Sequence, residues 1–239
     1  MKPDPVLLWA QDHFLHGQLL TPWITDYIDL EESLAVGSIA QEEFAHAALL
    51  LELAGADLVA RDELIYRWPQ ARWAPAALAT MPLPEWPDAV VRALLLATAA
   101  ATRTASLGES PEPNRRDAAI VLLAEQQLHI THWSRWVFRL GNDPRTAAAL
   151  AAAVTALLPA ATDLFDGFGV DEPAEQQLRR GWAKQVSTIL RSGGVLADPL
   201  VHPATARLDG THHDGLAAIL AEVRELRTTP DDGVLGMYR

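Results

Sequence analysis

The run Glu43-Phe44-Ala45-His46 places an acid and a histidine three residues apart in an apolar part of the chain. Residues at alternating spacings of three and four lie on one face of a helix, and this pair continues such a row. A carboxylate and an imidazole buried in that row destabilise a fold unless they are bonded to something. Glu-x-x-His is also the pattern with which helical bundles hold two metal ions. The other members of the row are Val36, Ile39, Leu50 and Leu53.

A second helical stretch carries Glu125 and His129, but it does not repeat the pattern. The residue three before the histidine is Gln126, and a neutral amide is a poor ligand for iron ions, which prefer hard anionic ligands. Glu125 lies about 100° further round the helix, away from the apolar row. This stretch can therefore offer His129 and, from a displaced position, Glu125.

A two-metal centre also needs a carboxylate from each of the two remaining bundle helices. No acidic residue occurs between Asp88 and Glu109, where the third long helix is expected, and the first helix offers only Asp12. We therefore predict an incomplete, vestigial metal site and assign no catalytic residue. A buried Glu–His hydrogen-bond network without metal is the alternative. The candidate metal ligands are Glu43, His46, Glu125 and His129.

Cap and turn residues divide the chain into helices. Asp29 and Glu32 predict an N-cap with its capping-box partner, and Gly55 predicts the end of the same helix. A connector rich in Trp and Pro, residues 68–87, is long enough to suggest a function or a packing role. Helices are expected over residues 4–20, 29–54, 58–66, 88–107, 115–140, 171–191 and 214–226, with one more that starts at Asp143-Pro144 and is kinked at Pro159.

The apolar and polar residues do not alternate as they do in strands, so the chain is predicted to be all-α. With 239 residues, 49% of them hydrophobic, it can bury one large core. We predict a single domain, residues 1–239, in which four long helices form a bundle core and additional helices follow on the C-terminal side.

Composition excludes several function classes. The chain has no cysteine, which rules out disulfides, thiolate metal sites and thiol nucleophiles, and a net charge of −12 argues against nucleic-acid binding. No signal-peptide pattern is present, and the apolar run 94–101 is too short to cross a bilayer. Serine-nucleophile and phosphate-loop motifs are also missing. We expect a cytoplasmic protein with neither nucleic-acid nor membrane partners.

Several blocks of the sequence resemble the PaaC-type phenylacetic acid catabolic proteins. The run Ala40-Gln41-Glu42-Glu43-Phe44-Ala45-His46-Ala47 is similar to the second core helix of that family, and Leu123-Ala124-Glu125-Gln126-Gln127-Leu128-His129 to its fourth. The blocks occur in the same order and spacing as in the family. Further similar positions are 52–55, Trp136, 139–141, 210–214 and 220–223, with Asp12, Gly17 and Trp23 in the N-terminal helix.

The resemblance implies a ferritin-like fold and membership of the ring-1,2-phenylacetyl-CoA epoxidase, a multicomponent monooxygenase. In that assembly a di-iron catalytic subunit of PaaA type pairs with a homologous non-catalytic subunit, and a reductase supplies electrons. The resemblance thus implies a hetero-oligomer, with a homodimer as a further option, and no cofactor in this chain. The chain departs from the family at Gly215, which replaces a histidine, and in its tail, residues 231–239.

Three functions follow from these patterns. The first is a scaffold subunit that supports a catalytic relative. The second is a stand-alone metal-dependent oxidase or oxygenase with iron or manganese at Glu43, His46 and His129, with Glu42, Glu125 or Asp12 recruited nearby. The third is a metal-free binding protein for an acyl-CoA or another apolar ligand, held between the connector and the bundle.

Overall fold

The computed structural model describes residues 4–25, 29–83, 85–168 and 171–228. Throughout these ranges the regular secondary structure is helical and no strand occurs, which confirms the all-α prediction. The α-helices are α1 (Pro5–Leu20), α2 (Leu30–Leu53), α3 (Leu58–Arg67), α4 (Trp86–Leu107), α5 (Pro113–Asn142), α6 (Ala147–Leu157), α7 (Glu172–Ser192) and α8 (Asp214–Thr228).

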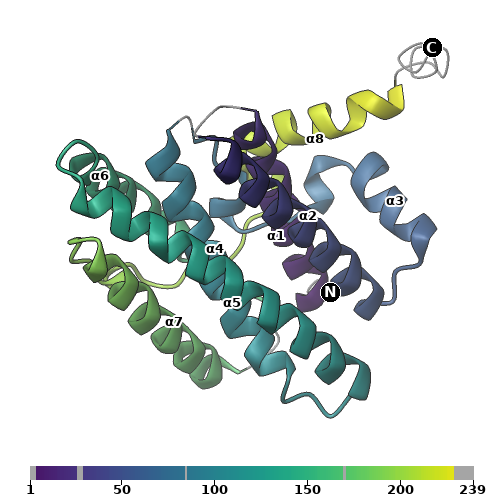
Figure 1. Cartoon of the computed structure of the whole chain (residues 1–239). Coiled ribbons are helices and arrows are strands. Elements are labelled where there is room, and N and C mark those ends of the chain that lie inside the picture. Colours follow the sequence, from purple (N-terminus) through teal and green to yellow (C-terminus); the bar gives the residue numbers. More distant parts are fainter. Residues whose placement is uncertain (1–3, 26–28, 84, 169–170, 229–239) are drawn as a thin grey trace.

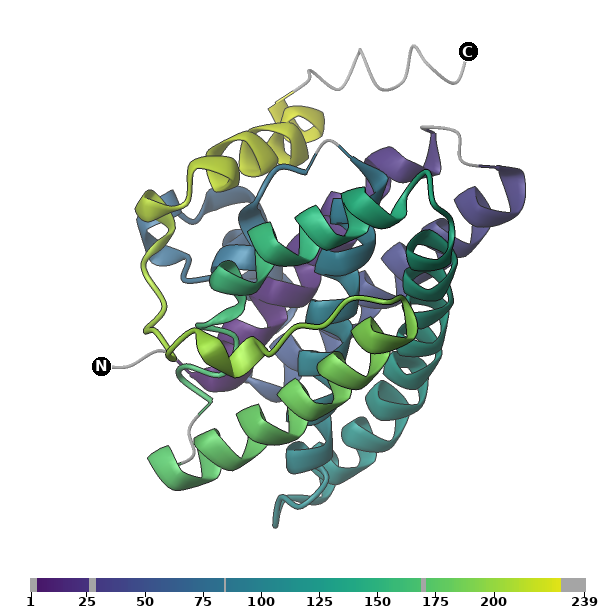
Figure 2. The ribbon, with the colours of Figure 1, turned by 90° about the vertical axis from the view of Figure 1, so that its left-hand side faces the viewer.

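Four helices, α1, α2, α4 and α5, form the core bundle (Figure 1). α1 packs mainly on α2 and α4 mainly on α5, and the two pairs meet through α2 with α5 and α1 with α4. A long connection that contains α3 joins the pairs. α6 and α7 contact α4 and α5, and Figure 2 shows the chain after α7 running back across the bundle to α8. The predicted bundle core with additional C-terminal helices is confirmed, whereas the single domain stays a prediction.

The caps of α2 follow the sequence in part. Asp29 is the N-cap, because its Oδ1 accepts a hydrogen bond from the Glu32 amide at 2.7 Å, and Gly55 ends the helix with a positive φ of 83°. The Glu32 side chain was expected to complete a capping box. Instead it accepts a hydrogen bond from His132 of α5 at 2.9 Å, which links two core helices rather than closing a helix end.

The predicted start of the helix after α5 is wrong by three residues. Asp143 accepts hydrogen bonds from the backbone and side chain of Arg145 and stabilises a turn, and α6 begins only at Ala147. At Pro159 the expected kink takes the form of a 3-10 helix, Leu158–Ala161, that follows directly on α6.

The connector packs on α1. The Ala74 and Ala76 amides donate to Gln11 and Asp12 at 2.9 and 2.8 Å, and the Trp73 side chain is fully buried. These contacts tie the proline-rich segment to the bundle, so much of its length serves packing.

α4 is the central helix of the bundle. By length and mean hydropathy it could cross a membrane, but 78% of its most apolar stretch is buried inside the fold. Such burial is typical of the core helix of a folded bundle. Two arginines, Arg92 and Arg103, are also buried in it.

Gly141 of α5 and Gly193, the residue that follows α7, allow these two helices to approach closely. A Cβ added at Gly141 would collide with the backbone of Gly193, whereas one added at Gly181 of α7 would meet nothing within 4 Å. We expect Gly141→Ala to lower the free energy of unfolding by about 1–3 kcal/mol, because backbone must move. The matched Gly181→Ala should raise it by about 0.5–1 kcal/mol through helix propensity. Urea unfolding measures both changes, and equal effects would contradict the close approach.

Candidate functional site

Glu43 of α2 lies at the centre of a buried polar network between α1, α2 and α5. The carboxylate is 1% exposed. His13 of α1 donates from Nδ1 to its Oε2 at 2.5 Å. Gln126 Nε2 and His129 Nδ1, both on α5, donate to its Oε1 at 2.9 and 3.0 Å. One carboxylate therefore joins three helices of the core.

Gln126 links Glu43 to the second residue of the Glu-x-x-His pair. Its amide nitrogen also lies 3.1 Å from His46 Nδ1, so one hydrogen goes to the carboxylate and the other to the imidazole. The side chain is fully buried. An ionised acid at position 126 could not donate, and it would face Glu43 as a like charge. The amide is thus the group that lets this network close on itself.

His129 is held between two carboxylates. Its Nδ1 faces Glu43 at 3.0 Å and its Nε2 faces Glu42 at 2.6 Å. Ionised carboxylates only accept hydrogen bonds, so both ring nitrogens must donate, which requires the imidazolium form. Burial opposes this charge, but the hydrogen bonds and charges of Glu43 and Glu42 outweigh it and raise the pKa of His129.

His46 has the opposite environment. Its Nε2 donates to Glu125 at 2.5 Å, whereas its Nδ1 accepts from the Gln126 amide. This arrangement fixes a neutral imidazole with the proton on Nε2. Burial and the nearby His13 lower the pKa of His46 despite the charge of Glu43.

These two environments predict opposite titrations. In a histidine NMR titration, His129 should titrate above the ordinary pKa of 6.5 and His46 below it. The His129 contribution to stability is present below pH 6.5 and is lost as pH rises through its folded-state pKa, since the folded state binds the proton more tightly. In Gln126→Leu, the pKa of His129 should stay above 6.5, because His129 keeps its hydrogen bonds to Glu43 and Glu42. A reversed order would contradict the assigned network.

A second buried cluster surrounds Asp12 of α1. Arg103 of α4 donates to its Oδ2 at 2.8 Å, and Arg207, from the segment before α8, donates to both oxygens at 2.9 and 2.6 Å. Burial alone would raise the pKa of Asp12, but the two arginines lower it to about 2. Asp12 is therefore committed to structural ion pairs, not to the network around Glu43.

The residues present do not fit a two-metal centre. α4 presents apolar side chains and the buried Arg103 where a carboxylate would be needed, and between Asp88 and Glu109 it carries no acid. The position on α5 that should offer an acid holds Gln126, whose donors already bind Glu43 and His46. These residues therefore give no support to a reaction at a pair of metal ions.

All four predicted metal ligands meet in the network, although whether they bind metal stays a prediction. Glu43 and His46 come from α2, and His129 from α5, as the helical spacing indicated. Glu125, which looked displaced, reaches His46 because its side chain spans the seam between α5 and α2. Asp12 lies in its own cluster.

Two histidines of α1 were missed by the sequence interpretation, which tested that helix only for acids. His13 and His16 are 3% and 2% exposed, and their Nε2 atoms have no hydrogen-bond partner among the described residues. The His-x-x-His spacing was the available signal. His13, Glu43 and His46 offer ligand atoms that all lie within 4.8 Å of one another.

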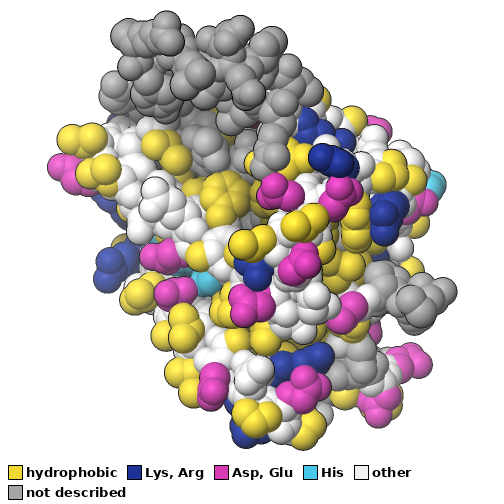
Figure 3. Space-filling model, turned by 90° about the vertical axis from the view of Figure 1, so that its right-hand side faces the viewer, with side chains coloured by type: hydrophobic (Ala, Val, Ile, Leu, Met, Phe, Trp, Pro, Cys, Tyr) yellow, Lys and Arg dark blue, Asp and Glu magenta, His cyan; other side chains and the backbone are white. Residues whose placement is uncertain are grey.

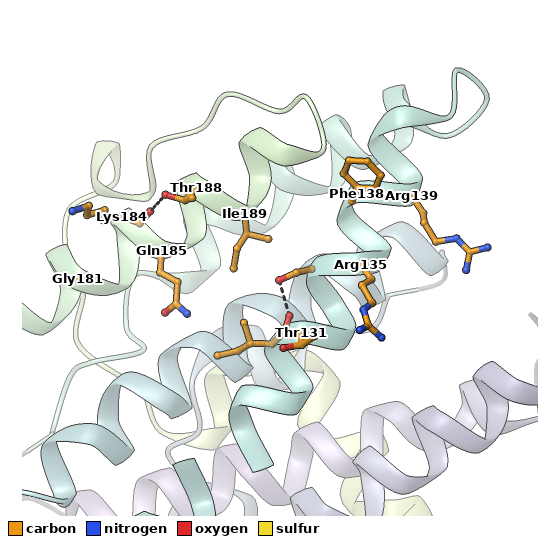
Figure 4. A pocket seen from close by; sticks show the side chains of 11 residues that line it. Thr131, Arg135, Phe138, Arg139, Gly181, Lys184, Gln185, Thr188 and Ile189 are labelled. Carbon is orange, nitrogen blue, oxygen red and sulfur yellow. Dashed lines mark hydrogen bonds between the residues drawn. The ribbon is translucent and has the colours of Figure 1, made fainter. Parts of the chain in front are cut away.

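A pocket with a different lining lies apart from this network. It is an open groove of about 890 Å³ between α5 and α7. Figure 4 shows Thr131, Gln185 and Ile189 facing the space between the helices, while Arg135 and Arg139 point away from α7. Among the described residues, no acid or histidine lines the groove, so this lining offers neither a carboxylate nor an imidazole for chemistry.

Four core helices around a buried polar centre define a ferritin-like helical bundle. A family model described as phenylacetic acid catabolic protein matches residues 4–234. The chain belongs to this family, which implies a role in phenylacetate catabolism. The match covers PaaA-type and PaaC-type members together and does not separate them. A comparison with curated proteins found no match.

Proposed function

We propose that this chain is a structural, non-catalytic subunit of a multicomponent phenylacetyl-CoA 1,2-epoxidase in aerobic phenylacetate degradation. In the cytoplasm it supports a homologous di-iron catalytic subunit of PaaA type, as a hetero-oligomer, and holds no cofactor itself. Family membership supports the pathway. The observation that carries the non-catalytic role is the Gln126 amide, which bonds Glu43 and His46 in place of an acid.

The network serves this role by stabilising the bundle. A metal ion at Glu43 would have to displace donors from His13, Gln126 and His129. A connected buried network of this kind rigidifies and specifies a core. The polar centre therefore holds α1, α2 and α5 in register for a partner.

The surface offers apolar side chains for docking. Leu34 of α2 is 66% exposed and Leu128 of α5 is 67% exposed. A contiguous exposed apolar patch marks a protein contact, and we propose that these two leucines, on the contacting helices α2 and α5, belong to one. On the face shown in Figure 3, basic side chains are scattered among acidic and hydrophobic ones, which fits a protein partner better than a nucleic acid.

Co-expression with a PaaA-type subunit tests the proposal. We expect the two chains to co-elute in size-exclusion chromatography with light scattering. Leu34→Asp combined with Leu128→Asp should reduce co-elution, whereas Leu196→Asp, at a residue that is 82% exposed on the segment after α7, should not. A chain that stays monomeric beside every PaaA-type subunit tried would overturn the scaffold role.

One observation favours the alternative of a stand-alone metal-dependent oxidase or oxygenase. His13, Glu43 and His46 form a two-histidine, one-carboxylate cluster, a ligand set known for single iron ions. Metal analysis of protein purified without chelator discriminates between the two functions. Iron or manganese below about a tenth of an equivalent would end the alternative, since a folded binding site retains its metal.

A further inference from the structure

An apolar cavity of about 210 Å³ lies between α1, α2 and α3, outside the polar network. Phe14 of α1 and Phe44 of α2 form an aromatic wall, with ring centroids 5.8 Å apart. Ala47 and Ala48 of α2 have short side chains that leave the space open. The rest of the lining is Ala10, Leu51, Leu64, Ile65 and Arg61.

α3, which supplies Arg61, Leu64 and Ile65 to the cavity lining, is attached to α8. α3 packs on α8. Arg224 of α8 donates to the carbonyl oxygens of Ile65 and Trp68 at 3.1 and 2.7 Å, at the C-terminal end of α3. These bonds attach the C-terminal end of α3 to α8.

Of the described residues that line the cavity, Arg61 is the only charged one. Its Nη2 donates to Glu52 at 3.1 Å and its Nε to the Ala56 carbonyl at 3.4 Å, and its side chain is 20% exposed. A guanidinium carries more N–H donors than these two contacts use. The Glu52 side chain is 70% exposed, so an anion can replace it as partner at little cost.

We infer that this cavity binds a small aromatic monocarboxylate. An apolar cavity of about 150 Å³ accepts benzene, and the larger volume here leaves room for a short side chain on the ring. The ring would pack against Phe14 and Phe44, and the carboxylate would meet the Arg61 guanidinium, which suits it geometrically. A second charge would be buried among apolar side chains, which excludes dicarboxylates. The inference does not depend on the role of the chain as a subunit.

Calorimetry with phenylacetate and its neutral isostere phenylacetamide tests the assignment. We expect one phenylacetate per chain, with a Kd at least about tenfold lower than that of phenylacetamide, because a charge-assisted hydrogen bond is lost in the amide. NMR shifts should fall on residues around Phe14, Phe44 and Arg61.

Two variants test separately the charge of Arg61 and the volume of the cavity. Arg61→Gln should raise the Kd of phenylacetate to that of phenylacetamide and leave phenylacetamide unchanged. Ala48→Leu fills the space and should weaken both ligands by about tenfold or more. The matched controls are Arg67→Gln on the same helix and Ala45→Leu at an exposed position of α2, and both should bind like the unaltered chain.

Three results would overturn the inference. One is no binding of either compound to a folded chain. Another is equal affinity for acid and amide, which would remove Arg61 from recognition. The third is binding that survives Ala48→Leu in a variant with an unchanged unfolding transition, because the ligand would then lie elsewhere.

Discussion

Glu43→Ala is expected to lower the free energy of unfolding by about 3–5 kcal/mol, the usual cost of removing one partner from a buried charged network. The donors of His13, Gln126 and His129 would lose their shared acceptor in a site with almost no access to water. Urea unfolding measures the change. Gln41→Ala, an exposed position on the same helix, serves as the control and should stay within about 0.5 kcal/mol.

The Glu43 carboxylate should also make the free energy of unfolding depend on pH under acidic conditions. Burial would raise the pKa of Glu43, but His13, His16 and the hydrogen bonds from His129 and His13 lower it well below 4.5. Its contribution is therefore fully present above pH 4.5 and is lost as pH falls through the folded-state pKa. Glu43→Gln should show a weaker acid dependence. If Glu43→Ala lowered the free energy of unfolding by less than about 1 kcal/mol, the network would not be coupled to folding.

Asp12→Ala is expected to cost about 3–5 kcal/mol as well, because it leaves Arg103 and Arg207 buried without their anion. Both guanidiniums are buried, with side chains 2% and 4% exposed. The Ala76 amide would also lose its acceptor. Since Arg207 attaches the segment before α8 to α1, limited proteolysis should cut that segment sooner in the variant.

The acid dependence of this cluster has a defined window. The pKa of Asp12 falls from 3.8 to about 2, so its stabilisation is complete above pH 3.8 and is lost as pH falls toward 2. Asp117→Ala, an exposed acid on α5, is the matched control. An unfolding midpoint and a cleavage pattern shared by both variants would contradict the role of Asp12.

Local patterns predicted what depends on near neighbours in the chain. The three-and-four spacing on α2 placed Glu43 and His46 on its buried face, since helical periodicity alone decides which residues share a face. Asp29 and Gly55 marked the ends of that helix, because capping involves residues within one turn. Glu32 could close a capping box or bond another helix, and it bonds His132 of α5. Asp143 could cap a helix or stabilise a turn, and it accepts a hydrogen bond from the Arg145 amide in a turn.

The polar centre could be predicted only in part. Four of its members, Glu43, His46, Glu125 and His129, were predicted from the sequence. The contact of Glu125 with His46 and the contact of His13 with Glu43 were not predicted. Long side chains bridge helices according to the distance and rotation between them, which spacing within one helix does not contain.

The sequence by itself determined an all-α chain, the helix that carries Glu43, and the absence of acidic residues between Asp88 and Glu109. The tertiary structure alone decided that Gln126 hydrogen-bonds both members of the Glu-x-x-His pair, and that Arg207 binds Asp12 across 195 residues of chain. The physical reason is the range of the forces involved. Helix formation responds to neighbours a few residues apart, whereas buried charges find partners only after the helices have packed.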